Sequence, residues 1–361
     1  MIGARTFKPD DIHAFQIEDA EGHVLYVRTT LDPMLQKWAV EFMPKVRAQA
    51  AALVVLAPST GRVLAMASHQ PDGQPVNIAL SSSFPAASLI KIVTAAAAME
   101  KKKMDSDTTL AYDGRKHTLY KKHLEKGIQE GHNKVTLQEG FAQSINTVFG
   151  KLGAFTLGSK ELASFARKFH FNQPIDFEMP VQKSEFHVQA KEDPYRLAEL
   201  ASGFNRTTTL SPLHGAMLAS AVVNQGILME PTIVREVFDE NNRIYYQDEP
   251  KSLGRVVSIR TVQELRKLMQ ATVSEGTGRR RFRDAARHPV LSKLEIGGKS
   301  GSINNEAGRR VDWFVGYAQI MNQTEAAALA AVVVHGEKLG IRSQELIREA
   351  LIRYFQPRVL D

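Results

Sequence analysis

Apolar residues recur every three or four positions early in the chain, directly after a possible cap region at residues 30–32. Leu35, Trp38, Ala39 and Phe42 follow this spacing, which places them on one face of a helix. A threonine or aspartate ahead of such a run can cap the first helical turn. The pattern predicts a helix within residues 33–50. The first 25 residues are expected to form an arm or linker outside the core.

Apolar runs of strand length occur early and late in the chain. Residues 52–57 and 62–67 are joined by Pro58-Ser59-Thr60-Gly61, a turn composition that predicts an antiparallel hairpin. Three further strand candidates, separated by short polar links, are 293–303, 312–320 and 327–334. Two early and three late strands predict one five-stranded antiparallel sheet, drawn from residues 51–67 and 293–335.

Helical patterns fill the long segment between these strands. The expected helices are 88–100, 137–150, 160–169 and 212–225, with another at 343–354 after the last strand. The fold class is therefore α/β of the α+β kind, a five-stranded antiparallel sheet flanked by helices, with a mainly helical subdomain over about residues 88–225. We find no repeat or low-complexity linker, so residues 26–361 are expected to form one domain.

The composition is that of an ordinary globular protein. The chain has 361 residues, of which 43% are hydrophobic and 24% charged, as in ordinary globular proteins. No apolar run approaches the roughly 20 residues of a membrane span, and the first residues lack the layout of an export signal. We expect any signal or anchor to be missing from this chain. Without cysteine, disulfides and thiolate sites are excluded.

Charge adds little to this picture. A formal net charge of +7 favours anionic partners, but the basic runs 115–134 and 279–283 lack the aromatic and glycine pattern of nucleic-acid modules. We therefore expect no nucleic-acid partner. His117, His123 and His132 share one basic segment without a carboxylate or cysteine at ligand spacing, which favours solvated loop histidines over a metal site. No metal and no cofactor are expected.

Ser88 and Lys91 are the first candidate catalytic residues. A serine hydroxyl is a weak nucleophile that needs a neighbouring base, and positions three apart share one face of a helix. Their apolar neighbours are Leu89, Ile90, Ile92 and Val93. Burial among these residues would lower the pKa of the lysine towards that of a base. The chain has no other S-x-x-K, although a lone pair of this kind also fits an ordinary helix.

Two further motifs contain polar residues that could take part in catalysis or substrate binding. In Ser144-Ile145-Asn146, a hydroxyl can relay a proton and an amide can hold a carbonyl, although such a triplet is often only a helix cap. In Gly297-Gly298-Lys299-Ser300-Gly301-Ser302, small residues let a substrate backbone pair with the strand, and the lysine offers charge to a carboxylate. Alone, this motif also fits a glycine-rich hairpin strand.

The order and spacing of the three motifs resemble the signature of penicillin-binding proteins and serine β-lactamases. The likeness extends from about residue 25 to about residue 335. Further segments that resemble landmarks of penicillin-binding-protein transpeptidase domains are 27–32, 54–66, 135–143, 210–214, 276–279 and 312–314. This density makes coincidence implausible, and residues 26–361 resemble one transpeptidase domain.

The resemblance implies a serine D,D-transpeptidase or D,D-carboxypeptidase that acts on the D-Ala-D-Ala end of peptidoglycan stem peptides. The implied catalytic residues are Ser88 as nucleophile, Lys91 as proton acceptor, Ser144 as proton relay, Asn146 and Lys299. The implied substrate-binding residues are Ser300, Gly301 and Ser302. Backbone N–H groups of Ser88 and Ser302 would hold the oxyanion, each donor worth roughly 2.7 to 4 kcal/mol.

The resemblance also implies partners and a location. β-Lactams are expected as covalent inhibitors, cell-wall synthesis proteins as possible partners, and the site of action as extracytoplasmic, with a membrane anchor in the full-length protein. The alternatives are a β-lactamase, for which no deacylating glutamate is identified, and a non-catalytic β-lactam sensor or scaffold, against which the complete motif set argues.

The chain departs from the family pattern at three places. Ala86-Ala87 replace the usual Pro-Gly before the nucleophile, and Ser300 replaces threonine. Residues 203–206 differ from the glycine–glutamine pair of many relatives, which predicts an altered acceptor side.

Overall fold

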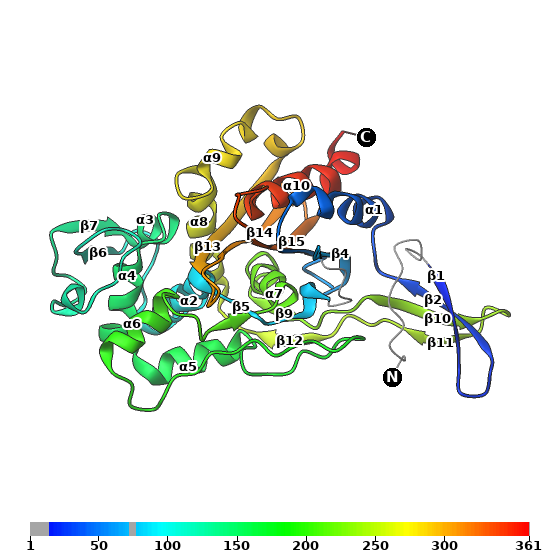
Figure 1. Cartoon of the computed structure of the whole chain (residues 1–361), viewed down its shortest axis with the longest axis horizontal. Coiled ribbons are helices and arrows are strands. Elements are labelled where there is room, and N and C mark those ends of the chain that lie inside the picture. Colours follow the sequence, from blue (N-terminus) through cyan, green and yellow to red (C-terminus); the bar gives the residue numbers. More distant parts are fainter. Residues whose placement is uncertain (1–13, 72–76, 361) are drawn as a thin grey trace.

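The computed structural model describes residues 14–71 and 77–360, and its centre is a five-stranded antiparallel sheet (Figure 1). In spatial order the strands are β13 (Leu294–Asn304), β14 (Arg310–Ile320), β15 (Ala326–Val334), β3 (Ala50–Leu56) and β4 (Val63–His69). The predicted sheet and fold class are confirmed, and each strand end lies within two residues of its expected position. β13, at one edge, carries the Lys299 motif.

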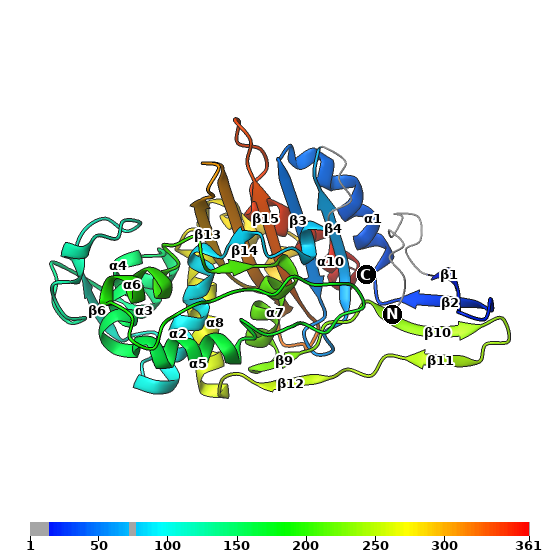
Figure 2. The same ribbon diagram turned by 60° about the horizontal axis from the view of Figure 1, so that its bottom comes forward.

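Helices cover both faces of the sheet, which is why its strands read as unbroken apolar runs. On one face lie α1 (Pro33–Phe42) and α10 (Ser343–Val359), and on the other lies α7 (Pro212–Val223) (Figures 1 and 2). Leu53 and Val55 of β3 face the first pair, whereas Val54 faces α7. No helix in the described part of the chain is long and apolar enough to span a membrane.

The helical subdomain lies beside the β13 edge (Figure 2). Its elements are α2 (Lys91–Lys102), α3 (Leu137–Ala142), α4 (Asn146–Lys151), α5 (Gly158–Lys168), α6 (Pro194–Ser202) and a hairpin of β6 (Thr109–Tyr112) and β7 (Asn133–Thr136). A helix α8 (Ile259–Ser274) and the short α9 (Arg279–Phe282) follow later in the chain and join this region to the sheet.

Two expected helices differ from the structure at the positions that carry chemistry. The single helix expected over 137–150 is wrong: Ser144 adopts a left-handed backbone with φ 56°, which cannot continue a right-handed helix, so α3 ends and α4 begins anew at Asn146. The helix expected over 88–100 begins with a 3-10 turn, Ala87–Ile90, and becomes α-helical at Lys91.

A second sheet was not predicted. It contains β1 (Ala14–Glu18), β2 (Val24–Thr29), β10 (Val234–Asp239) and β11 (Ile244–Gln247), and it extends away from the main sheet (Figures 1 and 2). The boundary expected at residue 25 falls inside β2. Of the expected arm, residues 1–13 lie outside the described residues, and the rest belongs to this sheet.

Short strand pairs connect the remaining segments. β5 (Phe84–Pro85) pairs with β8 (Thr209–Leu210), and β9 (Ile227–Met229) pairs with β12 (Ser252–Arg255). The first of these pairs holds the residues just before Ser88 against the segment that follows α6.

Gly298 generates a stability prediction, because its position on β13 leaves no room for a side chain. A Cβ atom there would lie 2.3 Å from Cζ of Phe314, whose ring is fully buried. Gly298→Ala must displace this ring, and we expect it to lower the free energy of unfolding by about 1–3 kcal/mol, measured by urea denaturation. Gly127→Ala, whose Cβ would meet only a Glu130 oxygen at 3.3 Å, is the control. Equal losses in both variants would contradict the prediction.

Candidate active site

Ser88 lies in a tight turn whose preceding residues are held by two hydrogen bonds from distant parts of the chain. The N–H of Ala86 donates to the carbonyl of Thr208 at 2.8 Å, and Nε1 of Trp313 donates to the carbonyl of Pro85 at 3.0 Å. Ala87 adopts a left-handed backbone with φ 47°, which for a non-glycine residue costs roughly 1–2 kcal/mol. The chain thus adopts this costly conformation at the residue directly before Ser88.

Edge strand β13 runs directly beside this turn. A Cβ on Gly301 would lie 3.3 Å from the carbonyl oxygen of Ala86, so strand and turn are in close contact. Because β13 has a neighbour on one side only, an extended peptide could pair with its free edge. The nucleophile therefore faces a strand edge that is open to such a partner.

Lys91 is fully buried and lies at the centre of the polar network. Its Nζ lies 2.6 Å from Oγ of Ser88, 2.8 Å from Oδ1 of Asn146 and 2.8 Å from the carbonyl of Ser202. Burial, with the charge of Lys299 as a second cause, holds the pKa of Lys91 well below its ordinary value. The lysine is therefore suited to act as a base.

The geometry indicates which group gives its proton to Lys91. A neutral amine has two N–H donors and one lone pair. If Asn146 and the Ser202 carbonyl accept the two N–H groups, the lone pair is left for the Ser88 hydroxyl, which can then donate its proton to Lys91. This is the proton transfer that activates a serine nucleophile.

Ser144 connects Lys91 to the second buried lysine. Its Oγ lies 3.0 Å from Nζ of Lys299 and 3.5 Å from Nζ of Lys91. Burial lowers the pKa of Lys299 to about 7, and its Nζ also donates to the carbonyl of Ser300 at 3.0 Å. The left-handed backbone at Ser144 that ends α3 places its hydroxyl between the two amines, where it can pass a proton.

Asn146 is held in one orientation by three contacts. Its Oδ1 accepts from Lys91, its Nδ2 donates to the carbonyl of His117 at 2.9 Å, and its backbone N–H donates to the carbonyl of Lys116 at 2.7 Å. The side-chain amide thus has a defined donor end and acceptor end. The same contacts fasten the 116–117 segment to the wall of the site.

The three histidines of the basic segment have different surroundings. Burial, followed by the charge of Lys91, lowers the pKa of His117, which lies beside the site. His132 is exposed and pairs with Asp113. His123 is buried against Gly114, so the expectation of a solvated loop histidine is wrong at this position.

The three small residues after Lys299 continue along the β13 edge. Oγ of Ser300 shares a hydrogen bond of 2.6 Å with Oγ1 of Thr277, Gly301 touches the Ser88 turn, and Ser302 is exposed. The structure thus joins Ser88, Lys91, Ser144, Asn146 and Lys299 directly and places the three small residues beside them on one strand.

Two contributors were not named as site residues from the sequence. Thr277 belongs to Gly276-Thr277-Gly278, a segment identified only as a landmark, yet its hydroxyl bonds Ser300. Ser202 contributes a backbone carbonyl, and no side-chain pattern reveals such a group.

A Ser-x-x-Lys turn set against the edge strand of an antiparallel sheet, with a helical subdomain beside it, is the arrangement of the serine D,D-peptidase class. The chain belongs to the penicillin-binding protein family, because the model of the penicillin binding protein transpeptidase domain matches residues 51–352. The resemblance noted in the sequence is thereby confirmed.

Curated relatives are identical to the chain at about a quarter of the aligned positions. The peptidoglycan D,D-transpeptidase PbpA of Mycobacterium tuberculosis is 26% identical over 351 residues, which cover 86% of this chain and 67% of PbpA. Stage V sporulation protein D of Bacillus subtilis is 26% identical over 262 residues, 69% of this chain and 39% of that protein. The chain thus spans between about two fifths and two thirds of these relatives.

Solved structures share the fold. The D,D-transpeptidase domain of a peptidoglycan glycosyltransferase from Eggerthella lenta has a TM-score of 0.74 at 23% identity, covering 96% of both chains. The imipenem acyl-enzyme complex of penicillin-binding protein A from M. tuberculosis has a TM-score of 0.75 at 23% identity, covering 91% of this chain and 79% of that one.

The pKa of Lys299 generates a pH prediction. Acylation by a penicillin is expected to require neutral Lys91 as base and charged Lys299 beside the drug carboxylate. Because the pKa of Lys299 is lowered to about 7, the second-order acylation rate constant should fall as pH rises through about 7, when this charge is lost. In Lys299→Arg the guanidinium stays protonated, so the fall should move to higher pH. Stopped-flow measurement of the acylation rate constant from pH 5.5 to 9 gives the profiles of the wild type and of Lys299→Arg. A fall at the same pH in both proteins would refute the assignment.

Gly203, the first residue after α6, generates a second prediction. Its φ is 74°, and a Cβ there would lie 1.9 Å from the carbonyl oxygen of Ala87, so Gly203→Ala must displace the turn that carries Ser88. We expect acylation to slow at least tenfold and the unfolding free energy to fall by about 2 kcal/mol. Gly22→Ala has a comparable φ of 87° with nothing within 4 Å and controls for backbone strain. Wild-type acylation in Gly203→Ala would show that the contact does not position the nucleophile.

Proposed function

We propose that the chain is a serine D,D-transpeptidase that acts on D-Ala-D-Ala stem peptides in peptidoglycan synthesis through an acyl-enzyme on Ser88. The observation that carries this proposal is the 2.6 Å contact between Nζ of Lys91 and Oγ of Ser88, with two further acceptors at 2.8 Å around the same amine. This arrangement supports a neutral lysine that removes the serine proton.

The reaction follows from the positions of the polar groups. Ser88 Oγ attacks the carbonyl of the penultimate D-Ala, its proton moves to Lys91, and backbone N–H groups of Ser88 and Ser302 stabilise the oxyanion. Ser144, between the two lysines, passes a proton to the leaving D-Ala amine. Lys299 holds the terminal carboxylate.

Ser300, Gly301 and Ser302 complete the substrate-binding edge, and Asn146 orients the substrate amide. Thr277 adds a second hydroxyl beside Ser300. The acyl group then moves to an acceptor amine, which restores the Ser88 hydroxyl. Transfer to water instead would make the protein a D,D-carboxypeptidase.

The surroundings of Lys91 also bear on the alternatives. A serine β-lactamase needs a group that activates a deacylating water, whereas among the described residues no carboxylate hydrogen-bonds Ser88 or Lys91, and the Ser202 carbonyl contacts the amine. A non-catalytic sensor or scaffold would not require Ser144 between two lysines. Both alternatives are therefore less favoured.

The proposal extends to partners and location. Stem peptides are the substrates, β-lactams the covalent inhibitors, and other cell-wall synthesis proteins possible partners, with residues 26–361 acting as the transpeptidase domain. Because peptidoglycan lies outside the cytoplasmic membrane, we place the domain on that side, anchored to the membrane in the full-length protein. The penicillin-binding protein A complex with imipenem supports the inhibitor assignment.

Intact-mass spectrometry with benzylpenicillin tests the nucleophile. We expect a covalent adduct that persists for hours on the wild type and is absent from Ser88→Ala, because Ser88 carries the hydroxyl that lies 2.6 Å from the Lys91 amine. Ser83→Ala, at an exposed serine five residues upstream, should keep the adduct. A rapidly lost adduct with drug consumption would indicate a β-lactamase instead. Release of D-Ala from a stem peptide, with an added amine captured in the product, separates an enzyme from a sensor.

A further inference from the structure

The segment 202–206 connects the catalytic residues to the far end of edge strand β13. The carbonyl of Ser202 accepts from Lys91, and Gly203 packs against Ala87. Arg206 then reaches across to the other wall, where its Nε donates to the carbonyl of Asn304, the last residue of β13, at 2.7 Å. One short segment therefore touches the base, the nucleophile turn and the substrate strand.

The guanidinium of Arg206 has free hydrogen-bonding capacity at this position. The side chain is exposed, and within residues 14–71 and 77–360 the structure records no acceptor for its two terminal NH₂ groups and no acidic partner. Arg196 on α6 differs, because it donates to Glu199 and Thr207. A planar guanidinium with both NH₂ groups free matches a carboxylate, which it can bind through two parallel hydrogen bonds.

The direction in which a substrate binds along β13 decides which of its residues lie beside Arg206. If the terminal carboxylate lies at Lys299 and the scissile carbonyl lies between Ser88 and Ser302, the residues that precede D-Ala-D-Ala continue along β13 towards Asn304. An extended chain advances about 3.3 Å per residue, so Ser302 to Asn304 corresponds to roughly 7 Å, or two residues. Arg206 therefore lies beside the one or two residues ahead of the D-Ala-D-Ala end.

We propose that Arg206 is a specificity-determining residue that binds a free carboxylate on the donor stem peptide, one or two residues before D-Ala-D-Ala. Donor peptides in which this carboxylate is amidated are then poorer substrates. The inference rests on the proposed D,D-transpeptidase function. It assigns Arg206 to the donor peptide, whereas the sequence of the segment 203–206 predicted an altered acceptor side.

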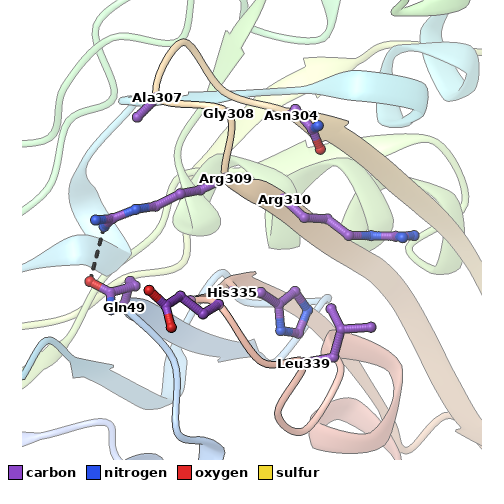
Figure 3. Close-up of a pocket in the computed structure, with 10 residues that line it drawn as sticks. Gln49, Asn304, Ala307, Gly308, Arg309, Arg310, His335 and Leu339 are labelled. Atoms are coloured by element: carbon purple, nitrogen blue, oxygen red, sulfur yellow. Dashed lines mark hydrogen bonds between the residues drawn. The ribbon is translucent and has the colours of Figure 1, made fainter.

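A second arginine at the same end of β13 provides a matched control. Arg309 is also exposed, but Nη1 donates to Oε1 of Gln49 at 2.9 Å (Figure 3). Together with Asn304, Arg310 and His335 it lines a hollow of about 670 Å³, and Arg206 does not belong to that lining. Arg309→Gln removes the same charge near β13 without touching the proposed carboxylate site.

The experiment compares acid and amide forms of one substrate. Synthetic peptides ending in D-Ala-D-Ala carry glutamate or glutamine at each of the two preceding positions, and D-Ala release gives kcat and KM. For the wild type and Arg309→Gln we expect kcat/KM to favour the acid form at one of the two positions by about tenfold, as for a charge-assisted hydrogen bond. In Arg206→Gln the ratio should fall to about one, mainly through a higher KM for the acid form, and Arg206→Lys should restore part of it.

The outcomes separate this inference from the proposed function. If the wild type treats acid and amide forms equally at both positions, or Arg206→Gln keeps the preference, the carboxylate site is refuted. A loss in Arg206→Gln that is equal for both forms would mean that Arg206 only ties the two walls together, which also overturns the inference. Failure of the wild type to release D-Ala from any of the peptides or to form a penicillin adduct would instead refute the proposed function.

Discussion

Burial of two lysine side chains within reach of one hydroxyl is the constraint on which the rest of the site depends. Removing an ammonium from water costs several kcal/mol even after the protein relaxes, and Lys91 and Lys299 also repel each other when both are charged. The hydrogen-bond partners of the two lysines come from separate parts of the chain. These parts are the Ser88 turn, the break between α3 and α4, the end of α6 and the edge of β13. These elements must meet at one place for either lysine to be buried.

Unusual backbone conformations occur at the place where these elements come together around the two lysines. Ala87 and Ser144, two of the site's immediate supports, adopt positive φ angles that carry an energetic cost for residues with a side chain. Gly203 is the third, and there the absence of a side chain also lets α6 approach the Ala87 carbonyl. The surrounding sheet and helices are rigid enough to hold all three.

The sequence predicted the main sheet well because both of its faces are covered, so strands such as β15 contain almost only apolar residues. It also located the three motifs, whose spacing resembles a known family. The break at Ser144 was missed, since the residues from Leu137 onwards are helical in composition and the left-handed turn depends on tertiary contacts. The second sheet was missed because β11 is exposed along its whole length and gives no alternating pattern. The roles of the Ser202 carbonyl and Arg206 depend on spatial position alone.

The pairing of β15 with β3 has a consequence for how the chain is made. Ala328 is opposite Leu56, so 272 residues separate two strands that are hydrogen-bonded neighbours. At a synthesis rate of about 5–20 residues per second, Leu56 at the end of β3 waits roughly 14 to 54 seconds for its partner. During that time β3 has a free apolar edge, which is the kind of surface that pairs with other chains. Completion of the sheet, and with it the β13 wall of the active site, therefore comes late in synthesis.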